Sequence, residues 1–144
     1  MRDDALLPGQ RLQRGVCRLL RSHDYATLDE VTPEPGLRVD VMALGPTGEI
    51  WVVECKSSRA DFTSDRKWQG YLPWCDRYFW AIPAGFPAEI LPEGAGLIVA
   101  DDFFGEIVSM APATPLAPAR RKALTLRFAR MAALRHQAMR DRAP

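Results

Sequence analysis

Two short apolar runs on either side of a turn-forming loop constrain the fold of this chain more than any other feature. Residues 37–44 and 50–57 are rich in Val, Ile and Trp, which favour strands over helices. The loop between them, residues 45–49, contains two glycines and a proline, so the runs are predicted to form an antiparallel hairpin. The expected facing pairs are Leu44 with Ile50, Met42 with Val52, and Asp40 with Glu54.

The rest of the chain alternates between helical and extended patterns. The expected helices cover residues 11–22, 61–71 and 119–140, with a single helical turn at 87–91. The other expected strands cover residues 26–32, 77–82, 96–100 and 106–110. Pro73 is expected to end the second helix, because proline lacks the backbone N–H that a helix needs. In the last helix, one sector holds Leu124, Phe128, Met131, Leu134 and Ala138. This order of elements predicts a mixed α/β domain.

Length and composition fit one cytoplasmic domain. The chain has 144 residues, of which 47% are hydrophobic and 26% are charged, as in ordinary globular proteins. No apolar run reaches the roughly 18 residues of a membrane span, and the N-terminus has no hydrophobic signal segment. The three cysteines are widely spaced, which favours reduced side chains in a cytosolic core over disulfides or a zinc site. We therefore expect a cytoplasmic protein without a membrane partner.

The charges are segregated along the chain. Residues 1–116 carry 11 Lys/Arg and 17 Asp/Glu, a balance of −6, whereas residues 117–144 carry 8 Lys/Arg and one Asp, a balance of +7. A basic segment of this kind is typical of contact with an anionic partner, but it could equally dock on the acidic body of its own domain. We therefore divide the chain into a domain over 1–116 and a basic helix over 117–144, which packs on that domain or extends from it.

Three charged residues at the far end of the hairpin form the candidate catalytic site. Side chains alternate along a strand, so Glu54 and Lys56 share a face, and the expected register adds Asp40 to it. Two adjacent carboxylates repel each other unless a positive charge lies between them. Lys56 alone could provide that charge as a salt bridge. Mg²⁺ would provide it better, because this ion binds through one or two carboxylates and completes its coordination with water.

Polar residues that suit a phosphodiester follow this site directly. Hydroxyl, cationic and amide groups bind phosphate oxygens in nucleic acids. The candidate DNA-binding residues are Ser57, Ser58, Arg59, Lys67, Gln69 and Tyr71. The alternative for residues 61–71 is a solvated amphipathic helix without a ligand.

The pattern of Asp40 with Glu54-x-Lys56 across a hairpin, with a helix on each side, resembles the PD-(D/E)XK nuclease superfamily. The expected order α-β-β-β-α-β over residues 11–82 is similar to the core of that superfamily. More narrowly, the stretch from Arg38 to Pro83 resembles the MmcB family of bacterial DNA-repair proteins. The motifs that carry this resemblance are Glu-Cys-Lys-Ser-Ser at 54–58, Asp-Arg-Lys-Trp at 65–68, Tyr-x-x-x-Cys-Asp at 71–76 and Leu-Ala-Pro-Ala-Arg-Arg at 116–121.

The resemblance implies a restriction-endonuclease-like core with an added β-hairpin and a C-terminal helix. It assigns Asp40 and Glu54 to the two metal carboxylates and Lys56 to the catalytic lysine. The proline that precedes the aspartate in the superfamily is replaced by Val39 here. The superfamily often adds a glutamate from its first helix. Residues 11–22 contain none, so Glu30 is the predicted substitute ligand. Gln69 matches a polar residue that many members carry on the second helix.

The function implied by this resemblance is a metal-dependent DNA endonuclease in DNA repair, which hydrolyses phosphodiester bonds with Mg²⁺ or Mn²⁺ as cofactor. The alternative is a catalytically weak or inactive DNA-binding or adaptor module on a nuclease fold. A plain α/β interaction protein would be favoured if Asp40 and Glu54 lay on opposite faces of the sheet. DNA is the expected partner, and a second copy of the chain is a further candidate partner.

Overall fold

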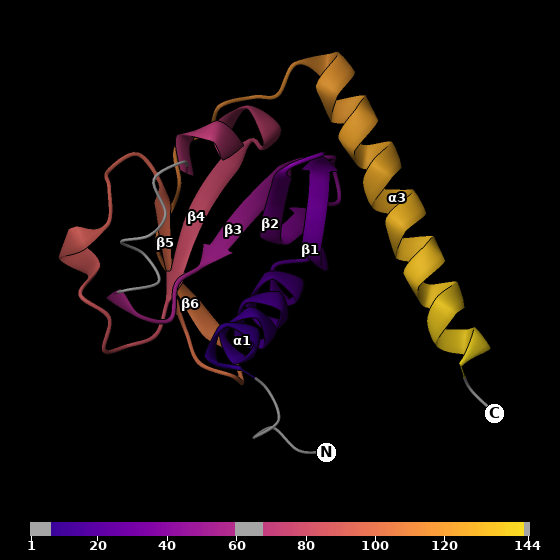
Figure 1. The fold of residues 1–144 in the computed structure, drawn as a ribbon. Helices are drawn as coiled ribbons and strands as arrows, with labels where there is room; N and C mark the ends of the chain where they lie inside the picture. Colours follow the sequence, from indigo (N-terminus) through magenta and orange to yellow (C-terminus); the bar gives the residue numbers. More distant parts are fainter. Residues whose placement is uncertain (1–6, 60–67, 143–144) are drawn as a thin grey trace.

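A mixed six-stranded sheet with helices on both faces forms the body of the protein (Figure 1). The structure, a computed structural model, describes residues 7–59 and 68–142. The elements are α1 (Pro8–Ser22), β1 (Ala26–Glu34), β2 (Leu37–Leu44), β3 (Ile50–Cys55), η2 (Trp68–Trp74), β4 (Arg77–Ile82), η3 (Ala88–Ile90), β5 (Gly96–Ala100), β6 (Gly105–Ser109) and α3 (Pro118–Asp141). The predicted α/β fold class is therefore confirmed.

The strands follow one another across the sheet in sequence order, from β1 to β6. The pairs β1–β2, β2–β3 and β5–β6 are antiparallel, whereas β3–β4 and β4–β5 are parallel. In the β2–β3 hairpin, Leu44 faces Ile50 and Met42 faces Val52, as the length of the loop predicted. This topology places the carboxyl ends of β3, β4 and β5 along one edge of the sheet.

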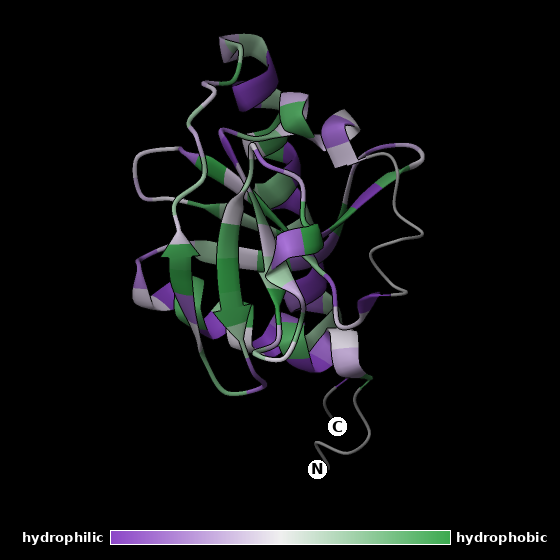
Figure 2. Ribbon diagram, turned by 90° about the vertical axis from the view of Figure 1, so that its left-hand side faces the viewer, coloured by the Kyte–Doolittle hydropathy of each residue, from purple (hydrophilic) through white to green (hydrophobic). Residues whose placement is uncertain are grey.

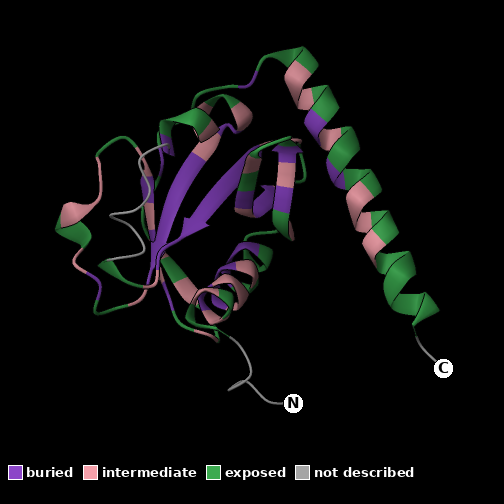
Figure 3. Ribbon diagram, viewed as in Figure 1, coloured by how far each residue is buried: buried purple, intermediate pink, exposed green. Residues whose placement is uncertain are grey.

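The two faces of the sheet are covered by different helices. Leu12, Val16 and Leu19 of α1 pack on one face, in a cluster that includes Trp51 and Phe79. The other face packs against α3 and η2 in a second cluster, which includes Met42, Val52, Trp68, Tyr78, Trp80, Leu124 and Phe128. Figures 2 and 3 show the central strands as hydrophobic and buried. In the part of the chain that the structure describes, no helix is long and apolar enough to cross a membrane.

Two details of the helices differ from the prediction. Pro73 does not end a helix but lies inside η2, a 3₁₀ helix. A short 3₁₀ turn accepts the fixed φ of proline, and it loses only one hydrogen bond through the missing N–H. In α3, Leu124 and Phe128 are buried as their spacing indicates, whereas Leu134 in the same sector is 57% exposed. The first half of α3 thus covers the core, and Figure 1 shows the helix continuing alongside β1.

A buried ion pair joins α3 to the sheet. The Asp76 carboxylate, between η2 and β4, is 4% exposed and accepts two hydrogen bonds of 2.7 Å from the Arg121 guanidinium. It also accepts the N–H of Ile50 at 2.8 Å and the N–H of Leu116 at 2.9 Å. Arg121 donates a further bond of 2.8 Å to the Gly48 carbonyl in the hairpin loop. One carboxylate therefore links β3, the segment before α3, and α3 itself.

We expect Arg121→Ala to destabilise the protein by about 3 kcal/mol, because it leaves a buried carboxylate without its cation. Urea denaturation at about pH 7 measures this change. The matched control is Arg120→Ala, whose guanidinium lies 4.0 Å from the centre of the Trp74 ring and should contribute only about 1 kcal/mol. Equal effects of the two substitutions would contradict the role given to the ion pair.

Acidification tests the same pair. Burial raises the pKa of Asp76, but the hydrogen bonds from Arg121, Ile50 and Leu116 outweigh it and hold the pKa below its ordinary value of 3.8. A carboxyl group of this kind stabilises the fold above its unfolded pKa and loses that effect as the pH falls through its folded pKa. Wild type should therefore keep its advantage in unfolding free energy over Asp76→Asn from about pH 7 down to about pH 5, and lose it as the pH falls below 3.8, the ordinary pKa of the group. An advantage independent of pH would rule this out.

Candidate active site

The structure brings Asp40, Glu54 and Lys56 together where β2 and β3 stop pairing. Backbone pairing between the two strands runs from Leu44–Ile50 to Val41–Val53. Just beyond it, Asp40 Oδ2 accepts the N–H of Cys55 at 2.8 Å, and Glu54 Oε1 accepts the N–H of Asp40 at 3.4 Å. Each carboxylate thus reaches the backbone of the opposite strand, so the two acidic groups lie side by side.

Lys56 completes this group of charges. Its Nζ lies 3.9 Å from Glu54 Oε2, and Glu54 and Lys56 are each 7% exposed. The backbone N–H of Lys56 bonds to the Ala81 carbonyl of β4 at 2.9 Å, which fixes the position of the residue directly after β3. A buried lysine is costly without a negative partner, and a buried carboxylate is costly without a positive one. In this cluster, the Lys56 ammonium therefore lies beside the carboxylates of Asp40 and Glu54.

The donor set of this cluster fits a hard divalent cation. Asp40 and Glu54 supply carboxylate oxygens, and Mg²⁺ binds through one or two carboxylates with water in its remaining positions. Among the described residues, no group of three or more His, Cys, Asp or Glu side chains forms a ready metal cage.

The charges of Asp40 and Glu54 affect the pKa of the neighbouring Cys55 thiol. The pKa of its buried thiol is raised well above the ordinary 9.0, first by burial and then by the charges of Asp40 and Glu54. Lys56 acts in the opposite direction, but its effect is smaller.

Glu30 lies across from Asp40 in the β1–β2 pair, between the facing pairs Asp29–Val41 and Val31–Val39. Its backbone adopts a left-handed φ of 51°, and its Oε1 lies 3.8 Å from Nη1 of the exposed Arg38. The described contacts therefore place the Glu30 carboxylate beside Arg38, and its proposed role as a metal ligand stays a prediction.

The predicted DNA-binding residues are spread over two segments. Ser57, Ser58 and Arg59 directly follow Lys56, and Arg59 and Ser58 are exposed. Gln69 is exposed in η2, whereas Tyr71 is half-buried with its ring 6.1 Å from that of Tyr78. Lys67 lies outside the described residues.

A small cavity lies between α1 and the carboxyl ends of the parallel strands. Its volume is about 240 Å³, and its lining includes Ser57, Pro83, Ala100, Asp101 and Arg11. Ser57 lines this cavity, whereas Asp40, Glu54 and Lys56 do not. Hollows outside the carboxyl ends of parallel strands are frequent ligand sites in α/β proteins.

Local sequence patterns do not reveal the pair of Asp76 and Arg121. Both residues fall in the motifs of the resemblance, at 71–76 and 116–121, but that resemblance gave neither residue a role. An acidic residue directly before an apolar strand, and an arginine in the first turn of a helix, were the available signals.

Comparison with known proteins identifies the family. Residues 7–143 match the family described as DNA repair protein MmcB-like. The chain belongs to this MmcB-like family. It is also similar to a solved structure, the SPO1766 protein of unknown function from Silicibacter pomeroyi, with 64% sequence identity and a TM-score of 0.93. That match covers 94% of this chain and 93% of the other. A comparison with curated proteins gives no match.

The reactivity of Cys55 tests the burial and the charges described for this MmcB-like site. We expect iodoacetamide at about pH 8 to leave Cys55 unmodified in the folded protein, because burial and two carboxylates disfavour the reactive thiolate. The same reagent on urea-unfolded protein is the control, in which all three cysteines should react. Peptide mass spectrometry measures both reactions, and rapid labelling of Cys55 in the folded chain would contradict the described burial.

Proposed function

We propose that this MmcB-like protein is a DNA endonuclease that hydrolyses phosphodiester bonds during DNA repair, with Mg²⁺ or Mn²⁺ as cofactor. The observation that carries the proposal is the convergence of Asp40, Glu54 and Lys56 at the end of β3. Membership in a DNA repair family supports DNA as the substrate. The resemblance to PD-(D/E)XK nucleases supports the reaction class.

In this mechanism, Asp40 and Glu54 would hold the metal through their carboxylate oxygens. A bound metal of this kind polarises a phosphoryl oxygen and makes water a stronger nucleophile. Lys56 keeps its ammonium next to Glu54, where it could orient the attacking water and offset the charge that develops on the phosphate oxygens. The hydroxyls of Ser57 and Ser58 and the guanidinium of Arg59 are the nearest groups in sequence that can donate to the flanking phosphates.

A catalytically weak DNA-binding or adaptor module is the second candidate. The observation that favours it is that Asp40 and Glu54 both accept backbone hydrogen bonds from the hairpin, so their carboxylates also hold β2 and β3 together. Metal-dependent nicking by purified protein supports the enzyme. Metal-independent retardation of the same DNA without any cutting supports the module.

The metal requirement is tested first. We expect wild type to cut at least one of a set of branched, flapped, single-stranded and damaged DNA substrates when Mg²⁺ or Mn²⁺ is present. Asp40→Asn should abolish the cutting, because it removes one carboxylate charge from the cation site while keeping the shape of the side chain. Calorimetric titration with Mn²⁺ should show binding to wild type and none to the variant. Cutting by Asp40→Asn at the wild-type rate would rule out this cluster as the catalytic site.

Lys56→Ala separates chemistry from binding. We expect the single-turnover rate at saturating Mg²⁺ and DNA to fall by about 10²–10³, because the ammonium acts on charge that develops in the transition state. DNA affinity should change little. Arg21→Ala is the control, since it removes an exposed cation from α1 on the opposite face of the sheet. Both variants are first checked for folding, because Lys56 also balances two carboxylates. If Lys56→Ala cuts as fast as wild type, the lysine is only a salt-bridge partner.

A further inference from the structure

The cations of α3 fall into two sets, and one of them holds the helix on the domain. Each member of this inward set contacts the body of the protein: Arg121 pairs with Asp76, Arg127 donates to the Thr32 carbonyl at 3.2 Å, and Arg135 lies 3.2 Å from Asp29 Oδ1. Arg120 lies over the Trp74 ring. The expectation that the basic segment docks on its own acidic body therefore accounts for four of its cations.

The second set consists of Lys122, Arg130 and Arg140, of which Arg130 also lines a groove with Pro33 and Trp74. All three residues are exposed, and none has a hydrogen bond or ion pair with any residue in 7–59 or 68–142. At 100° per residue, the three positions fall within a sector of about 80°. This sector lies opposite the buried Leu124 and Phe128. We call these three residues the outer stripe.

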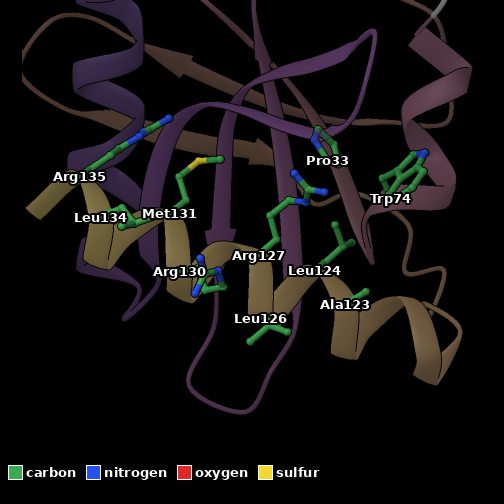
Figure 4. Close-up of a pocket in the computed structure, with 10 residues that line it drawn as sticks. All are labelled: Pro33, Trp74, Ala123, Leu124, Leu126, Arg127, Arg130, Met131, Leu134 and Arg135. Carbon is green, nitrogen blue, oxygen red and sulfur yellow. The ribbon is translucent and has the colours of Figure 1, made fainter.

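The charge of the outer stripe is not neutralised within the helix. An exposed helix commonly balances each lysine or arginine with a glutamate or aspartate four positions away. In α3, the first acidic residue is Asp141, at its last position. Figure 4 shows Arg127 and Arg135 extending from α3 towards the β1 side, whereas Arg130 stays over the helix. The stripe is thus a row of unbalanced positive charge.

The spacing of the stripe suits an extended polyanion better than a single anion. Lys122 and Arg130 are about 12 Å apart along the helix axis, and Arg130 and Arg140 are about 15 Å apart, at 1.5 Å per residue. The row is therefore about 27 Å long, which corresponds to about eight base pairs of duplex DNA at 3.4 Å per pair.

We propose that the outer stripe binds the phosphate backbone of DNA, independently of base sequence. This inference rests on the proposed action on DNA and assigns a second contact surface outside the Asp40–Glu54–Lys56 cluster. Contacts from lysine and arginine to phosphates position a protein on DNA but read no sequence. The competing occupant is an apolar protein segment. Leu126 and Leu134 are 61% and 57% exposed. They line a groove of about 670 Å³ together with Arg130 of the stripe, Trp74 and Pro33 (Figure 4).

The test compares two double variants of the full chain that remove the same charge. Lys122→Gln/Arg130→Gln removes two cations of the stripe, and Arg18→Gln/Arg21→Gln removes two exposed cations of α1, on the opposite face of the sheet. Glutamine keeps a good helix propensity at these positions. Fluorescence anisotropy with a duplex of about 30 base pairs, in EDTA to prevent cutting, gives the affinity at several KCl concentrations.

Each lost phosphate contact lowers the slope of log affinity against log salt by about 0.9, so the stripe variant should lose about 1.8. The α1 variant should keep the wild-type slope. An unchanged slope in the stripe variant, or an equal loss in both variants, overturns the inference while leaving the proposed nuclease intact. If wild type binds no DNA at any salt concentration, the inference and the proposed action on DNA both fail.

Discussion

The buried carboxylate of Asp76 is the interaction on which the rest of the structure depends. It accepts hydrogen bonds from two backbone N–H groups and from both terminal nitrogens of Arg121. A carboxylate with this little exposure is stable only when such donors surround it. Because the donors come from β3, from Leu116 and from α3, satisfying one charge fixes the relative positions of three segments. The docking of α3 thus follows from an electrostatic requirement as well as from the burial of Leu124 and Phe128.

The strand β3 connects this ion pair to the candidate active site. Its first residue, Ile50, donates to Asp76, and its other end carries Glu54 and leads into Lys56. Every residue of the strand is buried, and β3 pairs with β2 on one side and with β4 on the other. A site on such a strand is held more tightly than a site on a loop. The cluster of Asp40, Glu54 and Lys56 at the end of β3 can therefore keep its geometry, although its two carboxylates repel each other and burial removes water from its charges.

The sequence predicted the features that depend on local chemistry. Strands 37–44, 77–82 and 96–100 have the expected bounds. The first two are apolar runs that end at Gly45 and Pro83, and the third begins at Gly96. The hairpin register followed from the length of its loop. The partnership of Asp76 and Arg121 could not be predicted in this way, since the two residues lie 45 positions apart and meet only through the fold. The left-handed backbone of Glu30 and the exposure of Leu134 likewise depend on tertiary neighbours, which no local pattern encodes.

The segregation of charge resolves a conflict that the proposed chemistry creates. A metal-dependent nuclease needs carboxylates at its centre, and here the segment 1–116 that supplies them has a balance of −6. Such a body repels DNA, whose own charge is one phosphate per 1.7 Å of duplex. Cations placed among those carboxylates would neutralise the site that must attract the metal. Cations on a separate helix, of which one set docks the helix and the other is exposed, would restore the attraction to DNA without neutralising the site. The inward set and the outer stripe then belong to one arrangement. The contacts of the inward set hold α3, and with it the outer stripe, at the surface of an acidic domain.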